Sequence, residues 1–295
     1  MAQNNGDRSA FAPPTRQANS ALNGYTTKSD SDPSSSHTLW DVCLELRNKV
    51  DGFLAEDSET SLLRNVQARV REAMEVIDEA FQRYDPQEIS ISYNGGKDCL
   101  VMLILILAGL ARRKPPTSQK SSSITPNSSA DTTSFPDTFQ AVYIVSPHPF
   151  TEIDDFVISS SAEYQLDVTR YELGMKEGLE TYLGDRPNVK AIFVGTRRTD
   201  PHGEKLTHFD RTDSGWPDFM RVHPVIDWHY VEIWAFIRHL QIPYCSLYDQ
   251  GYTSLGGTKD THPNPNLKKQ GENGVQFLPA YELVGDSEER LGRDR

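Results

Sequence analysis

The sequence has few cysteines and no paired cysteine motif. Only three occur among its 295 residues, Cys43, Cys99 and Cys245, and none belongs to a CxxC pair. An odd number of widely spaced cysteines does not build a disulfide framework or a cysteine-rich zinc site. We therefore expect a protein of a reducing compartment and predict the cytoplasm.

A long apolar run is also missing. The longest, CLVMLILILAGLA from Cys99 to Ala111, is well short of the roughly 20 residues that cross a bilayer. The first residues lack the charged start and apolar centre of a secretory signal. The sequence therefore predicts a buried helix over this run and no membrane partner.

Basic residues are in deficit. The formal net charge is −12 and the isoelectric point is about 5.1, whereas a general nucleic-acid binder presents a basic surface. We expect no nucleic-acid partner. A phosphorylated ligand would have to be held by a local cluster of Arg, Lys and backbone N–H groups.

Two stretches are poor in apolar residues and rich in Ser, Thr, Asn and Pro. Residues 1–37 and 114–137 cannot bury enough surface to offset their ordering entropy. They predict a disordered tail and a flexible insertion within one domain. We expect that domain to cover 38–244, with a C-terminal extension over 245–295.

Apolar segments alternate between helical and strand patterns over the rest of the chain. Helices are expected at 39–84 (with a break near 57–60), 98–112, 152–164, 172–183 and 228–240, and strands at 88–93, 139–145, 166–171 and 189–195. This alternation predicts an α/β fold with a parallel sheet covered on both faces. Ligands of such sheets bind beyond the carboxyl ends of the strands, which directs attention to the residues after Tyr93, Val145 and Val194.

The first of these loops reads YNGGKDC, from Tyr93 to Cys99. Two glycines permit a close backbone approach to an anion, and the N–H groups at the following helix start suit phosphate. The spacing fits neither GxxxxGK[ST] nor GxGxxG. Asp98 would repel polyphosphate unless Mg²⁺ lies between them, so Asp98 is the candidate metal ligand. A glycine turn entering a buried helix remains the alternative.

Two later segments carry polar groups suited to a phosphorylated ring compound. GTRRTDP (195–201) supplies two arginines at the end of a predicted strand, where a solvated turn is the alternative. DSGWPDFMRVHPVIDW (213–228) reads as a loop in which an Asp could accept from a ring N–H and Trp216 could cover a ring. Trp228 and Trp234 are expected in the core.

Several motifs together resemble a known family. The 93–99 loop resembles the SGGxDS loop of the ATP-pyrophosphatase (PP-loop) families, with Asn94 and Cys99 in place of its two serines. SYNGGKDC (92–99), GTRRTDP, DSGWPDFMRVHPVIDW, IWAFI (233–237) and YELVGDSEERLGR (281–293) occur in the order of the eukaryotic FAD synthetases, the FMN adenylyltransferases of the phosphoadenylyl-sulfate-reductase-like group. The resemblance implies a Rossmann-like parallel sheet of the adenine nucleotide alpha hydrolase type, with a flavin-binding C-terminal extension.

The resemblance also implies an activity and its residues. FAD and pyrophosphate would form from FMN and ATP with Mg²⁺, the last step from riboflavin to FAD. We expect a monomer, and the one-domain length predicts no attached hydrolase domain. The ATP site would comprise Ser92, Asn94, Gly95, Gly96, Lys97, Asp98, Val145, Arg290 and Arg293. The flavin site would comprise Gly195, Arg197, Asp200, Asp213, Ser214, Gly215, Trp216 and Arg221. The catalytic set would be Asn94, Asp98, Asp200 and Arg290.

Three alternatives stay open at this point. A phosphoadenylyl-sulfate reductase or another PP-loop ATP pyrophosphatase that uses sulfur chemistry needs a reactive cysteine, yet Cys99 begins a buried helix and Cys245 has no evident partner. A regulatory protein could bind a nucleotide or flavin without releasing pyrophosphate. A zinc protein is the third, although His202, His208 and His223 show no HExxH pattern.

Overall fold

The computed structural model of the protein describes residues 37–113, 135–271 and 274–294. The disordered tail predicted over 1–37 lies outside this part of the chain except for His37. The insertion predicted over 114–137 lies outside it except for 135–137. The described residues belong to one unit that begins at His37.

Two helices precede the sheet, α1 (Leu39–Ala55) and α2 (Ser61–Arg83). Each begins at a threonine whose hydroxyl accepts from the first turn: Thr38 from Asp41 N–H and Thr60 from Leu63 N–H. The break predicted near 57–60 is confirmed. One face of α2 is apolar and buried, as its three- and four-residue spacing predicts.

The central sheet has the strand order β3-β2-β1-β4-β6-β5. Its strands are β1 (Ile89–Ser92), β2 (Phe139–Ile144), β3 (Leu166–Tyr171), β4 (Ala191–Phe193), β5 (Phe209–Arg211) and β6 (Met220–Val222). Neighbouring strands are parallel except β5, which runs antiparallel to β6 at one edge. The predicted α/β fold with a parallel sheet is confirmed. The prediction of a loop throughout 213–228 is wrong, because β6 lies within it; a three-residue strand is too short to show a period.

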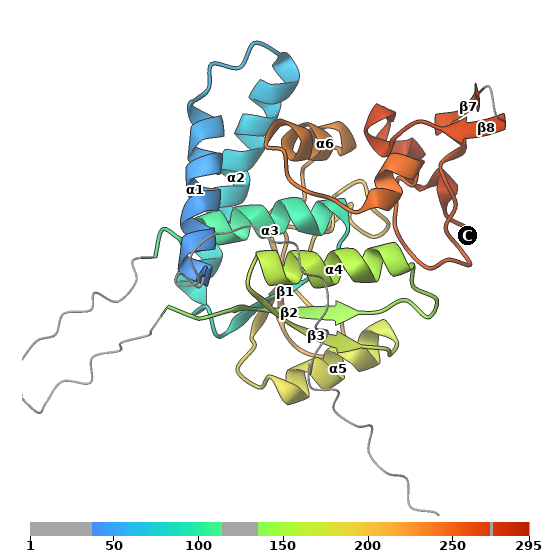
Figure 1. Ribbon diagram of the computed structural model, residues 1–295. Helices are drawn as coiled ribbons and strands as arrows, with labels where there is room; N and C mark the ends of the chain where they lie inside the picture. The colour runs from blue at the N-terminus through green and yellow to red at the C-terminus, as the bar shows by residue number, and fades with distance from the viewer. Residues whose placement is uncertain (1–36, 114–134, 272–273, 295) are drawn as a thin grey trace, which may run out of the picture. The chain divides into compact units, whose positions relative to one another are not determined.

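Helices cover both faces of this sheet (Figure 1). They are α3 (Lys97–Leu110), α4 (Thr151–Glu163), α5 (Met175–Asp185) and α6 (Tyr230–His239). α3 and α4 lie on one face and α5 on the other (Figure 1). Ile91 belongs to the larger core on the α3 side, whereas Val142 and Ile192 belong to a smaller core with Leu179 and Tyr182 of α5. Alternate strand residues therefore feed the two layers.

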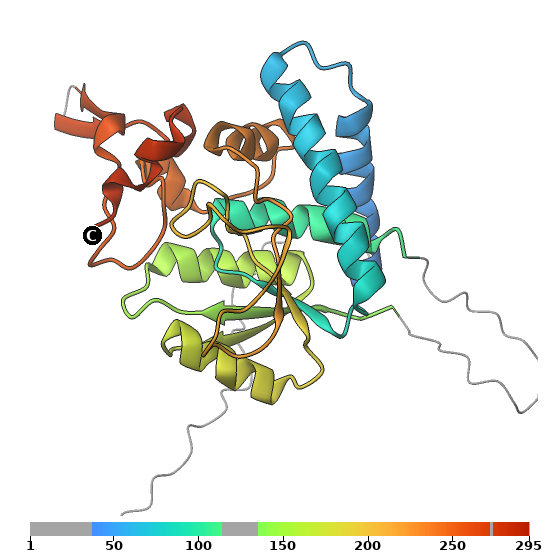
Figure 2. The same ribbon diagram turned by 180° about the vertical axis from the view of Figure 1, so that it is seen from behind.

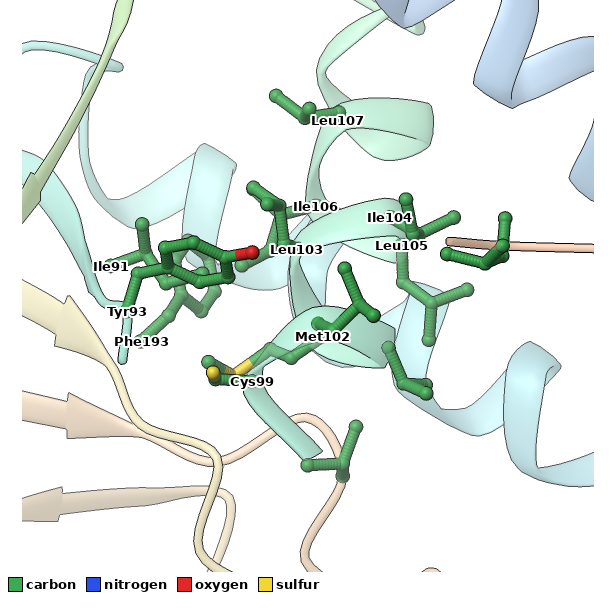
Figure 3. Packing of buried hydrophobic residues seen from close by; sticks show 14 of the residues in the cluster. Ile91, Tyr93, Cys99, Met102, Leu103, Ile104, Leu105, Ile106, Leu107 and Phe193 are labelled. Atoms are coloured by element: carbon green, nitrogen blue, oxygen red, sulfur yellow. The ribbon is translucent and has the colours of Figure 1, made fainter. Parts of the chain in front are cut away.

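The apolar run of the sequence forms α3, which is buried from Cys99 to Leu110. α3 contacts α1, α2 and α6 (Figure 2) as well as the sheet, so all its sides are covered, as expected of a helix that is apolar all round. Figure 3 shows its side chains packed near Ile91 and Phe193. No helix among the described residues has the length and apolar character needed to cross a membrane.

The last part of the chain consists of short turns and one hairpin. These are η1 (Ser246–Gln250), η2 (Pro265–Leu267), β7 (Lys268–Gly271), β8 (Gly274–Phe277), η3 (Ala280–Glu282) and η4 (Asp286–Gly292). Leu247, Tyr248, Leu267 and Ala280 join the larger core. The division at residue 244 stays a prediction.

Candidate functional site

The loops after β1 and β4 meet because these two strands are parallel neighbours. The contact is close: a Cβ on Gly195 would lie 3.0 Å from Cys99 N and 3.2 Å from Cys99 Cα. A side chain at position 195 would therefore push the second loop away from the start of α3. The structure brings the GTRRTDP segment directly against the phosphate-loop candidate.

The loop from Tyr93 to Gly96 enters α3 through a backbone shape that favours glycine. Gly95 has φ +72°, and a Cβ there would lie 3.0 Å from Val157 Cγ2. Gly96 N–H donates to Asn94 Oδ1 (3.0 Å), and Lys97 N–H donates to Tyr248 Oη (2.8 Å). The sequence predicted N–H groups open to an anion; two of them have protein partners, one from the exposed Asn94 and one from the buried Tyr248.

The Lys97 amine is buried and faces acidic groups. Lys97 is 1% exposed, and its Nζ donates to Asp98 Oδ2 (2.9 Å) and to Glu289 Oε1. Burial opposes its charge, but Asp98 and Glu289 outweigh that effect and raise the pKa of Lys97. The cation that the sequence assigned to ATP is thus already paired.

Arg197 lies at the centre of the same group and is fully buried. Its guanidinium lies 3.0 Å from Asp98 Oδ1, 3.2 Å from Asp200 Oδ1 and 3.6 Å from Asp286 Oδ1, and it also pairs with Glu289. The backbone N–H of Arg197 donates to Asp200 Oδ2 (2.8 Å). One arginine therefore joins four carboxylates from three parts of the chain.

We call the six residues the carboxylate cluster: Lys97, Asp98, Arg197, Asp200, Asp286 and Glu289. Four formal negative charges face two positive ones, which leaves two negative charges unbalanced. Burial opposes ionisation of Asp98, but Arg197 and Lys97 prevail and lower its pKa. Asp98, Asp200 and Asp286 are each about a quarter exposed, so the cluster opens to solvent on its acidic side.

The two C-terminal arginines differ in their surroundings. Arg290, in η4, is exposed, and its side chain has no hydrogen-bond or ion-pair partner in the part of the chain that the structure describes. Arg293 is half-buried: it donates to Leu255 O (2.8 Å) and lies 3.5 Å from Asp260 Oδ2. Arg290 is therefore open to a ligand, whereas Arg293 also holds the 255–260 loop.

That loop lies against the carboxyl end of β2. Thr258 N–H donates to His148 O (2.7 Å), and a Cβ on Gly257 would lie 2.8 Å from Ser146 Oγ. Val145, the predicted adenine neighbour, is buried directly before this contact. Ser92 is the half-buried last residue of β1.

Five of the predicted flavin residues form a separate group, whereas Gly195, Arg197 and Asp200 lie with the carboxylate cluster. Asp213, Ser214, Gly215 and Trp216 make the exposed turn between β5 and β6; Gly215 has φ +85°, and Trp216 N–H donates to Asp213 O (3.0 Å). Arg221 Nη1 lies 3.5 Å from Asp213 Oδ2.

The two groups lie at opposite ends of short parallel strands. The 213–216 turn precedes β6, whereas Asp98 and Asp200 follow β1 and β4. Three residues of strand span roughly 10 Å. The structure therefore does not bring Trp216 into the carboxylate cluster, and a ligand that reaches both must extend along the sheet.

Sequence reasoning missed three residues of the site. Asp286 and Glu289 stand in an acidic stretch that resembles a solvated chain end, and Tyr248 stands in a segment without a pattern. The sequence carries only an indirect signal for these acidic residues. Lys97 and Arg197 each follow a buried strand, and a buried cation requires an acidic partner. The sequence does not say which carboxylates supply them.

Comparisons with known proteins identify relatives of this chain. The family model for the phosphoadenosine phosphosulfate reductase domain matches residues 88–263. A probable FAD synthase of Schizosaccharomyces pombe is 37% identical, over 83% of this chain and 86% of that protein. A probable FAD synthase of Caenorhabditis elegans is 33% identical over 85% of this chain, which spans 45% of that longer protein.

A solved structure extends the likeness to the fold. The Candida glabrata FMN adenylyltransferase, crystallised with FAD and inorganic pyrophosphate, superposes with a TM-score of 0.77 at 29% identity, covering 87% of this chain and 99% of that one. This chain is 37% identical to the Schizosaccharomyces pombe protein over most of both chains, and it shares the fold of the Candida glabrata enzyme. It therefore belongs to the FAD synthase family.

Proposed function

We propose that this chain transfers the adenylyl group of ATP to the phosphate of FMN, giving FAD and pyrophosphate. The observation that carries the proposal is the carboxylate cluster, which ties the phosphate-loop candidate, the GTRRTDP loop and the Arg290 turn together at the ends of β1 and β4. Membership of the FAD synthase family supports it.

The chemistry needs little more than alignment. A phosphate monoester has a second pKa near 6 and is ionised at neutral pH, so the FMN phosphate requires no general base. One of its oxygens bonds to the α-phosphorus of ATP, the bond from that phosphorus to the bridging oxygen breaks, and pyrophosphate leaves with the electron pair. The task of the site is to hold two polyanions in line against their repulsion.

The residues divide this task. Arg290 supplies an exposed guanidinium, without a side-chain partner in the described part of the chain, for phosphate oxygens, and Asn94 presents an exposed amide at the loop. Asp98 and Asp200 hold Arg197 and, on their exposed side, are the carboxylates that can anchor a cation.

The family implies Mg²⁺, and the residues fit it. Among the described residues no three His, Cys, Asp or Glu side chains form a metal cluster, but Mg²⁺ at nucleotide sites commonly uses one or two carboxylates plus substrate phosphates. Asp98 Oδ1 is buried and, beside its ion pair with Arg197, makes no hydrogen bond among these residues, and the cluster carries excess negative charge. When bound, the ion would neutralise charge on the phosphates; Asp98 and Asp200 would hold it.

The direct test is product formation. Purified protein with FMN, ATP and MgCl₂ should yield FAD by chromatography and one pyrophosphate per FAD. Riboflavin in place of FMN should yield neither, because it lacks the attacking phosphate. Binding of FMN and ATP without either product would indicate a regulatory binding protein and end the proposal.

The flavin ring is assigned to the 213–216 turn. FMN carries its ring and its phosphate at opposite ends, which suits a ligand that lies along β6 between the two groups. We expect Trp216→Ala to raise the KM for FMN about 10-fold and leave the KM for ATP unchanged, because aromatic stacking on a ring contributes about 1–3 kcal/mol. Steady-state kinetics with each substrate varied tests this, with Trp216→Phe as the control that keeps an aromatic ring. Equal KM values for FMN in the wild type and Trp216→Ala would remove the residue from the site.

Cysteine chemistry separates this activity from that of the sulfur-transforming relatives. All three cysteines are buried, and burial raises the pKa of Cys99 to about 12 and that of Cys245 above its usual value. A neutral buried thiol is a poor nucleophile. We expect iodoacetamide at pH 7.5 to leave FAD synthesis unchanged over an hour. Rapid inactivation with alkylation of Cys245 would favour the reductase-like alternative.

A further inference from the structure

The η4 turn directs two successive side chains in opposite ways. Glu289 is 5% exposed and enters the carboxylate cluster, whereas Arg290 is exposed and unpaired within the described chain. Successive Cα atoms are only 3.8 Å apart. Contacts that hold Glu289 in place therefore also hold the Cα atom from which the Arg290 side chain extends.

Glu289 bridges the two loops of the site. One carboxylate oxygen pairs with Lys97 Nζ at the start of α3, and the other pairs with Arg197 Nη2 after β4. Both cations are at most 1% exposed, so these charge-assisted bonds are shielded from water and are strong. The bridge joins residues far apart in the chain through one side chain.

The backbone of the same turn is held as well. Thr253 Oγ1 donates to Glu289 O (2.6 Å), and Asn264 Nδ2 donates to Glu288 O (2.8 Å) and to Thr253 Oγ1 (2.9 Å). Thr253 and Asn264 are themselves buried. η4 is thus fixed through a side chain and through two carbonyl groups.

We infer that Glu289 is a positioning residue: it locks η4 onto Lys97 and Arg197 so that Arg290 is held ready for the polyphosphate. The inference rests on the proposed function and gives a role to a buried residue whose side chain contacts two cations of the protein. A prepositioned guanidinium needs no ordering at the moment of reaction, which is what makes such charges effective in catalysis.

The test is a double-mutant cycle on FAD formation. Arg290→Ala should lower kcat about 100-fold, and Glu289→Gln, which keeps the shape and removes the charge, about 10- to 100-fold, each with a change in KM for FMN below about 3-fold. Because Glu289 acts through Arg290, the double variant should be no slower than Arg290→Ala alone. Glu289→Asp, which keeps the charge, should recover part of the rate.

Two further measurements keep the inference open to refutation. Glu288→Gln, in the same turn and without a side-chain partner among the described residues, should match the wild type. If Glu289→Gln does not fold, Thr253→Val loosens the same turn without changing a charge, and it should lower kcat non-additively with Arg290→Ala and speed amide exchange over 290–293.

The outcomes distinguish this inference from the proposed function. A wild type that forms no FAD defeats the proposed function itself. A wild type that forms FAD, together with a Glu289→Gln variant that keeps its kcat or adds its full effect to that of Arg290→Ala, overturns the positioning role alone.

Discussion

Asp98→Asn should lower kcat for FAD formation by at least about 100-fold while the protein stays folded. Asp98 is held ionised by Arg197 and Lys97, which lower its pKa despite burial. Asparagine has nearly the same size but no charge. It would remove the carboxylate that can anchor a cation beside the phosphates and would loosen the contact between the phosphate-loop candidate and Arg197.

The fold should survive because both cations of the cluster keep a carboxylate partner. Without the Asp98 charge, Lys97 and Arg197 still face Asp200, Asp286 and Glu289. Far-ultraviolet circular dichroism and initial rates at saturating FMN and ATP give the two readouts. The matched control is Asp51→Asn, an exposed carboxylate in a surface pair with Arg47, which should change neither. A folded Asp98→Asn enzyme with wild-type turnover would refute a catalytic role for Asp98.

Most of the fold could be predicted from the sequence because long apolar periods determine it. The helix over 98–112 and the strands over 139–145 and 166–171 correspond to α3, β2 and β3 within about two residues. β5 and β6 could not be predicted in this way. They are three residues long and exist because β6 pairs with β4, a contact distant in the chain.

The site could be predicted only where a local motif determines where its residues lie in the fold. Glycine-rich strand ends place Asp98 and Asp200 at one edge of a parallel sheet, and the structure brings them to the same arginine. Which carboxylate meets Lys97 depends on how the C-terminal segment folds back. That is a tertiary contact: Glu289 lies 192 positions from Lys97 along the chain, and no local pattern encodes it.

The second large effect is expected from Arg197→Met, which should lower the free energy of unfolding by about 3–5 kcal/mol at pH 7.5 and abolish activity. The substitution keeps an apolar chain in the buried space but removes the guanidinium that Asp98, Asp200, Asp286 and Glu289 share, and the remaining cation, Lys97, pairs with Asp98 and Glu289. Glu289 is 5% exposed and Asp98 Oδ1 is buried, and a buried carboxylate oxygen that loses its counter-charge is costly. Arg112→Met is the matched control: Arg112 is exposed and pairs with Asp78, so its loss should cost less than about 1 kcal/mol.

The stability lost in Arg197→Met should depend on pH, and the direction of this dependence tests the explanation. In the wild type the pKa of Asp98 lies below its unfolded value of about 3.9, so its stabilisation is present above that pH and is lost as the pH falls through the lower, folded value. Without Arg197, the larger of the two opposing charges, burial becomes the dominant effect on Asp98 and should raise the pKa of Asp98 above the unfolded value. The folded variant then binds protons more readily than the unfolded chain, so its deficit relative to the wild type should grow from pH 5 to pH 8. Urea unfolding at both pH values measures this deficit, and equal deficits would show that Asp98 does not depend on Arg197 for its charge.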